Sequence, residues 1–166
     1  MLETSSIGKR IFLPVLFVTV LILLDQLTKK WAVSSLRGHD DIILIRGVLQ
    51  LRYIENRGAA FGILKDSRLF FIILTVLFAV VITVFYMSYY KRQHASMALV
   101  LLYSFLTAGA IGNFIDRLLH GFVVDFIYFS LIDFPVFNVA DIYITCSCVF
   151  VIIYVFLSEK KHGHSV

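Results

Sequence analysis

Two aspartates, Asp125 and Asp141, lie in apolar segments that contain no lysine or arginine. Asp125 is in the run FVVDFI at 122–127, and Asp141 ends the run FNVAD at 137–141. Two carboxyl groups held close together where water is scarce cannot both ionise easily, so such a pair tends to share one proton. This arrangement suits amide hydrolysis, because the ionised partner takes a proton from water while the protonated partner polarises the scissile carbonyl.

The two aspartates are too far apart along the chain, by 16 residues, for one helix to present both. If one apolar helix ends near Leu119 and the next begins near Asn138, both carboxyl groups lie at the same membrane face. Asn138, Asp141 and Thr145 then form one polar stripe. Taken singly, Asp141 could be a carboxylate at a helix N-terminus and Asp125 a solvated loop acid. Their occurrence at one face favours chemistry over these alternatives.

Other charged and amide side chains interrupt the apolar tracts and need partners there, because an ionised group is costly inside a bilayer. Asp25 and Lys29 are spaced i,i+4 with the acid first, which is the favourable order for a helical ion pair. Asn113, Asp116 and Arg117 share one helix face. We interpret both groups as supports that hold helices together and orient the reactive pair, and not as reactants.

Motifs for other chemistries are absent from the sequence. It has no His-x-x-x-His pair or cysteine cluster for a metal, no Gly-x-Ser-x-Gly and no P-loop. Cys146 and Cys148 would point to different faces of a helix, so we expect neither a disulfide nor a metal site. The net charge of +4 is spread over loops between apolar tracts. That distribution suits lipid headgroups better than nucleic acid, and we expect no nucleic-acid partner.

The elements that position these residues are predicted by the composition. Apolar residues make up 60% of the 166 residues and charged ones 16%, and the mean hydropathy is +0.90. Globular domains are usually about 45–50% apolar and about 25% charged. A chain of this length cannot hide so much apolar surface from water, so the apolar side chains must face lipid. The length fits a single domain over 1–166.

Four apolar tracts predict four membrane-spanning helices in an all-α membrane protein. Each is close to the roughly 20 residues that a span needs. In the third, Ala108 and Gly112 would allow a neighbouring helix to approach closely. The predicted spans are approximately 11–33, 69–90, 95–118 and 138–158.

The segment at 37–67 between the first two spans is rich in residues that favour strands. Ile42–Ile45 and Val48–Ile54 flank Gly47, and part of the second run alternates apolar and polar residues. We therefore predict a small two-stranded element lying on the membrane surface.

The orientation is not decided by the positive residues alone. The basic pair Lys91 and Arg92, and the lack of Lys or Arg at 121–138, place both termini in the cytoplasm. The segment from Lys29 to Arg68 argues for the opposite orientation. It carries eight basic residues on what would then be the outer side: Lys29, Lys30, Arg37, Arg46, Arg52, Arg57, Lys65 and Arg68. The short turns favour the first orientation.

Five short blocks occur in order along the chain, within approximately 11–157. They are DQLTK at 25–29, NRGAAFG at 56–62, GAIGNFIDR at 109–117, VVDF at 123–126 and FNVAD at 137–141. Together they resemble the motifs of the bacterial lipoprotein signal peptidases, also called type II or prolipoprotein signal peptidases. One block alone would be a weak signal, but five in order are specific, and no departure is seen at the functional positions.

The resemblance implies an intramembrane aspartyl endopeptidase of four transmembrane helices, with the 37–67 segment as a small extracytoplasmic β platform. The enzyme would lie in the bacterial inner membrane with both termini cytoplasmic and its site near the outer face. Its substrates would be diacylglyceryl-modified prolipoproteins, cut on the N-terminal side of the lipidated cysteine. The resemblance further implies no metal or organic cofactor, contact with membrane lipids and inhibition by globomycin. We expect a monomer.

The same resemblance assigns roles to individual residues. Asp125 and Asp141 would be the catalytic dyad. The other residues would line or support the substrate site: Asn56, Gly58, Asn113, Arg117, Asn138, Asp25, Lys29 and Asp116.

Two functions from other classes remain open on the residues alone. Acids inside a membrane could relay protons in a small carrier, although no inverted repeat is evident. They could also merely cap helices in a non-catalytic scaffold. Only the peptidase hypothesis predicts cleavage that substitution of either Asp125 or Asp141 abolishes.

Overall fold

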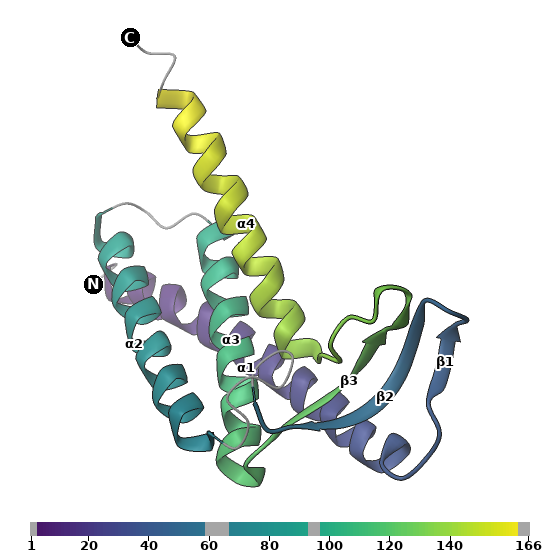
Figure 1. Cartoon of the computed structure of the whole chain (residues 1–166). Coiled ribbons are helices and arrows are strands. Elements are labelled where there is room, and N and C mark those ends of the chain that lie inside the picture. Colours follow the sequence, from purple (N-terminus) through teal and green to yellow (C-terminus); the bar gives the residue numbers. More distant parts are fainter. Residues whose placement is uncertain (1–2, 59–66, 93–96, 163–166) are drawn as a thin grey trace.

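The computed structural model describes residues 3–58, 67–92 and 97–162 and is predominantly helical. The turn near 93–96 and most of the second block, at 59–62, lie outside the described residues. Along the described residues, two strands follow the first α-helix and two more α-helices come next. A third strand and a short 3-10 helix, η2 (Ser130–Ile132), precede the last α-helix (Figure 1). The helices are α1 (Glu3–Leu36), α2 (Arg68–Arg92), α3 (Met97–His120) and α4 (Val139–His162).

Helix α3 occupies the centre of the bundle, because it packs against α1, α2 and α4. Two glycines of α3 allow α4 and the Asp25 side chain of α1 to lie directly on it. A Cβ atom at Gly109 would be 2.6 Å from the carbonyl oxygen of Ala140, and one at Gly112 would be 2.5 Å from Asp25 Oδ2. The close approach predicted from Gly112 is therefore present, and it brings the N-terminus of α4 against α3 and α1.

The strands form one antiparallel sheet in the order β1-β2-β3. Strands β1 (Ile42–Ile45) and β2 (Leu49–Asn56) are the two predicted strands. The turn between them contains Gly47 with a φ of 73°, a backbone conformation that glycine adopts without strain. Figure 1 shows the sheet beside the end of the bundle where α1 ends and α4 begins.

A third strand, β3 (Val123–Phe129), was not predicted, and it carries Asp125. It pairs with β2 so that Asp125 is opposite Ile54 and Val123 is opposite Asn56. The two-stranded interpretation and the loop alternative for Asp125 were therefore wrong. The run at 123–129 is rich in valine, isoleucine and aromatic residues, which favour strands. These residue types do not indicate a partner strand, and the partner β2 lies about 70 residues earlier in the sequence.

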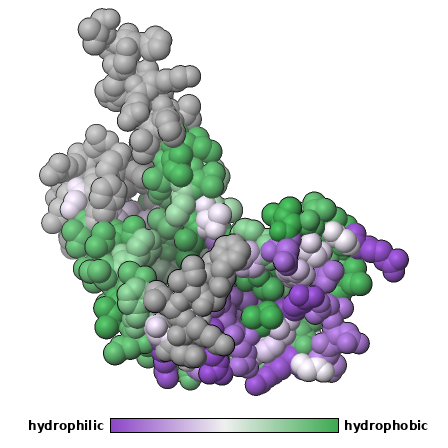
Figure 2. Space-filling model, viewed as in Figure 1, coloured by the Kyte–Doolittle hydropathy of each residue, from purple (hydrophilic) through white to green (hydrophobic). Residues whose placement is uncertain are grey.

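Many large apolar side chains on the helices face outward. On α2, Leu69, Ile73, Leu77 and Val81 are all exposed. In Figure 2, hydrophobic residues cover the visible face of the helices, while hydrophilic ones gather on the side that carries the sheet. Such an apolar surface is typical of a protein that contacts lipid.

Two described helices, Phe12–Leu36 and Arg68–Ser88, are long and apolar enough to cross a membrane. A shorter apolar stretch, Val139–Ile153, lies in α4. The helices extend past several predicted limits, since α1 runs to Leu36 and α4 to His162. The four predicted spans thus correspond to four helices, and the number of them that cross a membrane stays a prediction.

Candidate active site

Asp125 is held on β3 by two side-chain amides. Its carboxyl group is almost completely buried, with the residue 2% exposed. Asn56 Nδ2 donates a hydrogen bond to Oδ2 at 2.8 Å, and Asn138 Nδ2 donates one to Oδ1 at 2.6 Å. The Asn56 amide is itself oriented, because its Oδ1 accepts the backbone N–H of Gly58 at 3.0 Å. The two donors fix the direction in which the carboxyl group points.

Asp141 lies in the first turn of α4, where its side chain is fixed from both sides. Its Oδ2 accepts the backbone N–H of Asn138 at 3.0 Å, and its own N–H donates to Asn138 Oδ1 at 3.1 Å. This reciprocal pair is a capping box, which satisfies backbone donors that the helix leaves free. Asn113 Nδ2 also donates to Asp141 Oδ1 at 2.8 Å. Asp141 is therefore a carboxylate at a helix N-terminus, as one of the alternatives held. This position also brings its carboxyl group into the cluster with Asn113 and Asn138.

Asn138 links the two aspartates, because it contacts Asp125 through its side chain and Asp141 through its side chain and backbone. Its Nδ2 also donates to Asn113 Oδ1 at 3.1 Å. Asn138 is 0% exposed. It was expected among the groups that line or support the substrate site, and that role stays a prediction. The structure thus brings Asp125 and Asp141 into one hydrogen-bonded cluster.

The pKa of Asp125 is raised from 3.8 to about 7. Burial is the main cause, since it disfavours the charged form, and the negative charge of Asp141 is the second. The hydrogen bonds from Asn56 and Asn138 oppose this rise because they stabilise the carboxylate. Near neutral pH, Asp125 can therefore hold a proton that a carboxyl group in water would have lost.

A buried ion cluster lies behind the aspartates. Lys29 Nζ is 3.0 Å from Asp25 Oδ2 and 3.2 Å from Asp116 Oδ2, and it donates to Asn113 Oδ1 at 2.9 Å. The predicted pair of Asp25 and Lys29 is present, with Asp116 as a second acid. Gln26 completes the cluster, since its Nε2 is 3.1 Å from both Asp25 Oδ2 and Asp116 Oδ1.

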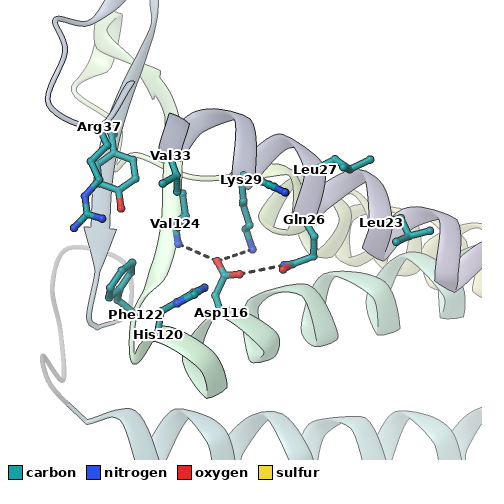
Figure 3. A pocket seen from close by; sticks show the side chains of 12 residues that line it. Leu23, Gln26, Leu27, Lys29, Val33, Arg37, Asp116, His120, Phe122 and Val124 are labelled. Atoms are coloured by element: carbon teal, nitrogen blue, oxygen red, sulfur yellow. Dashed lines mark hydrogen bonds and ion pairs between the residues drawn. The ribbon is translucent and has the colours of Figure 1, made fainter. Parts of the chain in front are cut away.

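The acids of this cluster hold the backbone on which each site aspartate is placed. Asp25 Oδ1 accepts the N–H of Ala140, next to Asp141, at 3.0 Å. Asp116 Oδ2 accepts the N–H of Val124, next to Asp125, at 3.0 Å. Figure 3 shows Asp116 between Lys29, Gln26 and the strand that carries Val124. The cluster therefore sets the positions of α4 and β3 relative to α1 and α3.

The positive charge of Arg117 interacts with the negative charges of Asp141, Asp125 and Asp116. Its guanidinium is 4.7 Å from the centre of the Phe71 ring, and its Nη2 donates to the carbonyl oxygen of Gly58 at 3.4 Å. Within the described residues it forms no ion pair with either site aspartate. Arg117 thus connects α3 to α2 through Phe71 and to the segment after β2 through Gly58.

The structure brings the two predicted aspartates and several of the predicted supports together, and it adds two residues that the sequence analysis did not include. Gln26 lies inside the first block, and its polar side chain in an apolar helix was a usable signal. Phe71 gave no signal, because it is one of many aromatic residues in α2.

Cys146 and Cys148 are free and exposed in α4. Among the described residues no group of three His, Cys, Asp or Glu side chains could hold a metal ion.

Solved structures place the chain in a class of bacterial membrane enzymes. One has a TM-score of 0.79 and 33% identity, with 91% of this chain and 92% of that chain covered. A second has a TM-score of 0.76 and 35% identity, with 87% and 93% covered. Both are described as bacterial membrane enzymes.

A sequence model described as signal peptidase (SPase) II matches residues 17–157. A lipoprotein signal peptidase of Brevibacillus brevis is 45% identical over 148 residues, with 89% of this chain and 97% of that protein covered. One of Clostridium tetani is 38% identical over 153 residues, with 90% and 94% covered. The chain belongs to the signal peptidase II family and is a membrane-bound protease. The resemblance drawn from the five blocks is confirmed.

Proposed function

We propose that this protein removes signal peptides from diacylglyceryl-modified prolipoproteins, cutting on the N-terminal side of the lipidated cysteine. Family membership supports the removal of prolipoprotein signal peptides. It also favours a peptidase over the carrier and the scaffold. The requirement for the lipid group and the cleavage position remain parts of the proposal.

The reaction uses Asp125 and Asp141 as a dyad, and the observation that carries this assignment is their joint attachment to Asn138. Asp141 is the ionised partner, because the N-terminal end of α4 and its two N–H donors stabilise negative charge there. Asp125 is the protonated partner, in keeping with its raised pKa of about 7. The two roles follow from the two environments.

Hydrolysis then proceeds without a covalent intermediate. Asp141 takes one proton from a water molecule, whose oxygen attacks the scissile carbonyl carbon. Asp125 donates its proton to the carbonyl oxygen, giving a neutral gem-diol. When the C–N bond breaks, the proton on Asp141 passes to the leaving nitrogen and a hydroxyl proton returns to Asp125. The dyad is restored with the same single proton.

The substrate approaches through the bilayer, since its cysteine carries acyl chains. All four helices cross the bacterial inner membrane in this proposal, both termini are cytoplasmic, and the site is near the outer face. Arg117 holds the peptide backbone in this proposal, because it donates to the Gly58 carbonyl oxygen and its charge interacts with those of Asp141 and Asp125. Globomycin would bind the same site and block it. The protein acts as a monomer with membrane lipids around it.

The test is cleavage of a diacylglyceryl-modified precursor by purified protein. Asp125→Asn and Asp141→Asn should each lower turnover by at least about 10³-fold, since each removes an acid or base from the reaction. Asp40→Asn is the matched control, because Asp40 is an exposed acid between α1 and β1. Retention of more than a tenth of wild-type turnover by either site variant would reject the dyad. Equal cleavage of the unlipidated precursor would reject the lipid requirement.

A further inference from the structure

A cavity of about 430 Å³ lies between α1, α3 and the sheet, away from the aspartate dyad. Val124 lines it, whereas Asp125, the next residue on β3, does not. Successive side chains of a strand point to opposite faces, so the cavity and the dyad are on opposite sides of β3. Figure 3 shows this cavity along α1, with Leu23 near one end and Arg37 near the other.

The two ends of the cavity differ in chemistry. Leu23 and Leu27 supply apolar side chains at one end, while Val33 and the ring of Phe122 lie toward Arg37 at the other (Figure 3). Lys30, Arg37 and His120 give the end nearer the sheet a polar and basic character. An elongated groove with an apolar half and a basic half matches one acyl chain joined to an anionic headgroup.

The basic end has an excess of positive side chains that the peptidase site does not use. The Arg57 guanidinium lies 5.6 Å from the centre of the ring of Phe122, which lines the cavity together with Lys30 and Arg37. Glu55 pairs with both Arg37 and Arg57. No described acid forms an ion pair with Lys30. Asp116, an acid that lines the cavity, is already paired with Lys29 and accepts hydrogen bonds from Gln26 and the Val124 N–H.

This excess gives a reason for the unusual charge of the 29–68 segment. In the proposed orientation, basic residues there are on the outer side of the membrane, against the usual bias. Helix α1 passes from its apolar middle at Leu23 to Arg37 just beyond its end, so the basic rim lies at headgroup level. Basic residues at that depth attract anionic lipids, each contributing about fivefold in affinity.

We propose that this cavity, which is separate from the catalytic site, binds one anionic phospholipid of the outer leaflet. The phosphate lies at Lys30, Arg37 and His120, and an acyl chain follows Leu23 and Leu27 along α1. The occupied site fills the space between α1, α3 and the sheet, and so stabilises the face of β3 opposite the dyad. The assignment of the lipid to the outer leaflet rests on the membrane orientation given under the proposed function.

Native mass spectrometry of the detergent-purified full chain tests the proposal, with phosphatidylglycerol and phosphatidylcholine as probes at equal concentration. One phosphatidylglycerol should bind, with about tenfold preference over phosphatidylcholine. Lys30→Ala should weaken phosphatidylglycerol binding about fivefold. Arg46→Ala is the matched control, because Arg46 is exposed on the sheet and is not part of the cavity, and it should leave binding unchanged. Equal affinity for the two lipids, or an equal loss in both variants, would overturn the proposal.

Two further measurements separate a phospholipid from other occupants. Leu27→Trp, at an exposed position, places a large ring at the apolar end and should also weaken phosphatidylglycerol binding. Inorganic phosphate should not displace the lipid, and displacement would indicate a site for a free anion. Phosphatidylglycerol should leave the KM for a lipidated precursor unchanged. A competitive rise in KM would assign the groove to the acyl chains of the substrate and overturn the proposal, while leaving the peptidase function intact.

Discussion

At the scale of residues, the two aspartates have the same side chain and different environments. Asp141 takes part in a helix cap and accepts two hydrogen bonds, one of them from a backbone N–H. Asp125 is enclosed by β3 and two asparagines, with a pKa raised to about 7 by burial and by Asp141. In the proposed reaction, this difference gives each carboxyl group its own role, although the protons of two coupled carboxyl groups titrate as a property of the pair.

The pH dependence of cleavage follows from the sign of that shift. Asp125 must be protonated to act as the acid, and its proton is lost as pH rises through about 7. The value of kcat/KM should therefore fall about tenfold per pH unit on the alkaline side. Asn56→Ala removes a hydrogen bond that stabilises the carboxylate, so it should move the alkaline limb to higher pH. Gln50→Ala, a control on the same strand, should leave the limb in place.

A pH profile measured with a lipidated precursor decides between these outcomes. An alkaline limb at the same pH in wild type and Asn56→Ala would contradict the assignment of Asp125 as the acid. The maximum turnover should also fall in Asn56→Ala, at every pH, because Asn56 Oδ1 accepts the Gly58 N–H and the variant loses this bond. The assignment of Asp125 is tested only by the pH at which the alkaline limb lies.

Lys29 should be essential for stability because it neutralises Asp25 and Asp116 in a buried cluster. Lys29→Met leaves two carboxyl groups facing each other without a cation. It should lower the free energy of unfolding by about 3–5 kcal/mol, which is typical of a broken buried ion pair. Thermal unfolding in detergent measures this. Arg46→Met, which removes an exposed cation, should change the free energy by less than about 0.5 kcal/mol. Equal Tm values for the two variants would refute the role of the cluster.

At the scale of elements, the site exists where three pieces of backbone meet. The N-terminus of α4 carries Asp141, β3 carries Asp125, and β2 ends at Asn56. Asp25 and Asp116 fix the first two by accepting the N–H groups of Ala140 and Val124. A small displacement of either element would separate the carboxyl groups, so residues that control packing also control activity.

Gly109→Ala tests that dependence. The added Cβ would lie 2.6 Å from the Ala140 carbonyl oxygen and 2.7 Å from Ile144 Cγ1, so α4 must move away from α3. We expect a loss of about 1–3 kcal/mol in stability, as for other overpacked contacts. Turnover should fall more than Tm alone would explain, because Asp141 follows Ala140. Ser88→Ala, at an exposed position of α2, should preserve both. Wild-type turnover in Gly109→Ala would show that the contact does not position Asp141.

At the scale of the whole molecule, apolar helices and a polar sheet occupy different parts of the structure (Figure 2). In Figure 1 the C-terminal end of α4 lies away from the sheet. If α4 crosses the membrane, the sheet and this end of the helix are therefore on opposite sides. This separation makes the topology measurable with two positions.

Cysteine labelling in intact cells provides that measurement. Cys146 and Cys148 are first replaced by serine, and a single cysteine is then introduced at Asp40 or at Lys160. A membrane-impermeant maleimide should label the cysteine at 40, beside the sheet, and should label the one at 160 only after the cells are opened. Labelling of both in intact cells would refute the four-span topology. Labelling of 160 alone would reverse the orientation.

The sequence by itself predicted that the protein lies in a membrane and that it has four long helices. It also singled out Asp125 and Asp141 as the candidate catalytic residues. These follow from local information, because a long apolar tract predicts a helix in lipid and a charge within one needs a purpose. The spacing of Asp25 and Lys29 predicted their pair for the same reason. The capping box of Asn138 and Asp141 is also formed by residues close in sequence. The sequence analysis had placed Asp141 at a helix N-terminus but had not predicted its reciprocal hydrogen bonds with Asn138.

The tertiary structure alone decided what meets across the chain. It placed Asp125 in a strand, because β3 is formed by hydrogen bonds to β2, about 70 residues away in sequence, and pairing at that distance leaves little local trace. It buried Asn138 between the aspartates, and it gave Asp116 the Val124 N–H. Burial and hydrogen-bond partners depend on how elements pack. The raised pKa of Asp125, and the acid role proposed for it, could therefore be inferred only once its neighbours were known.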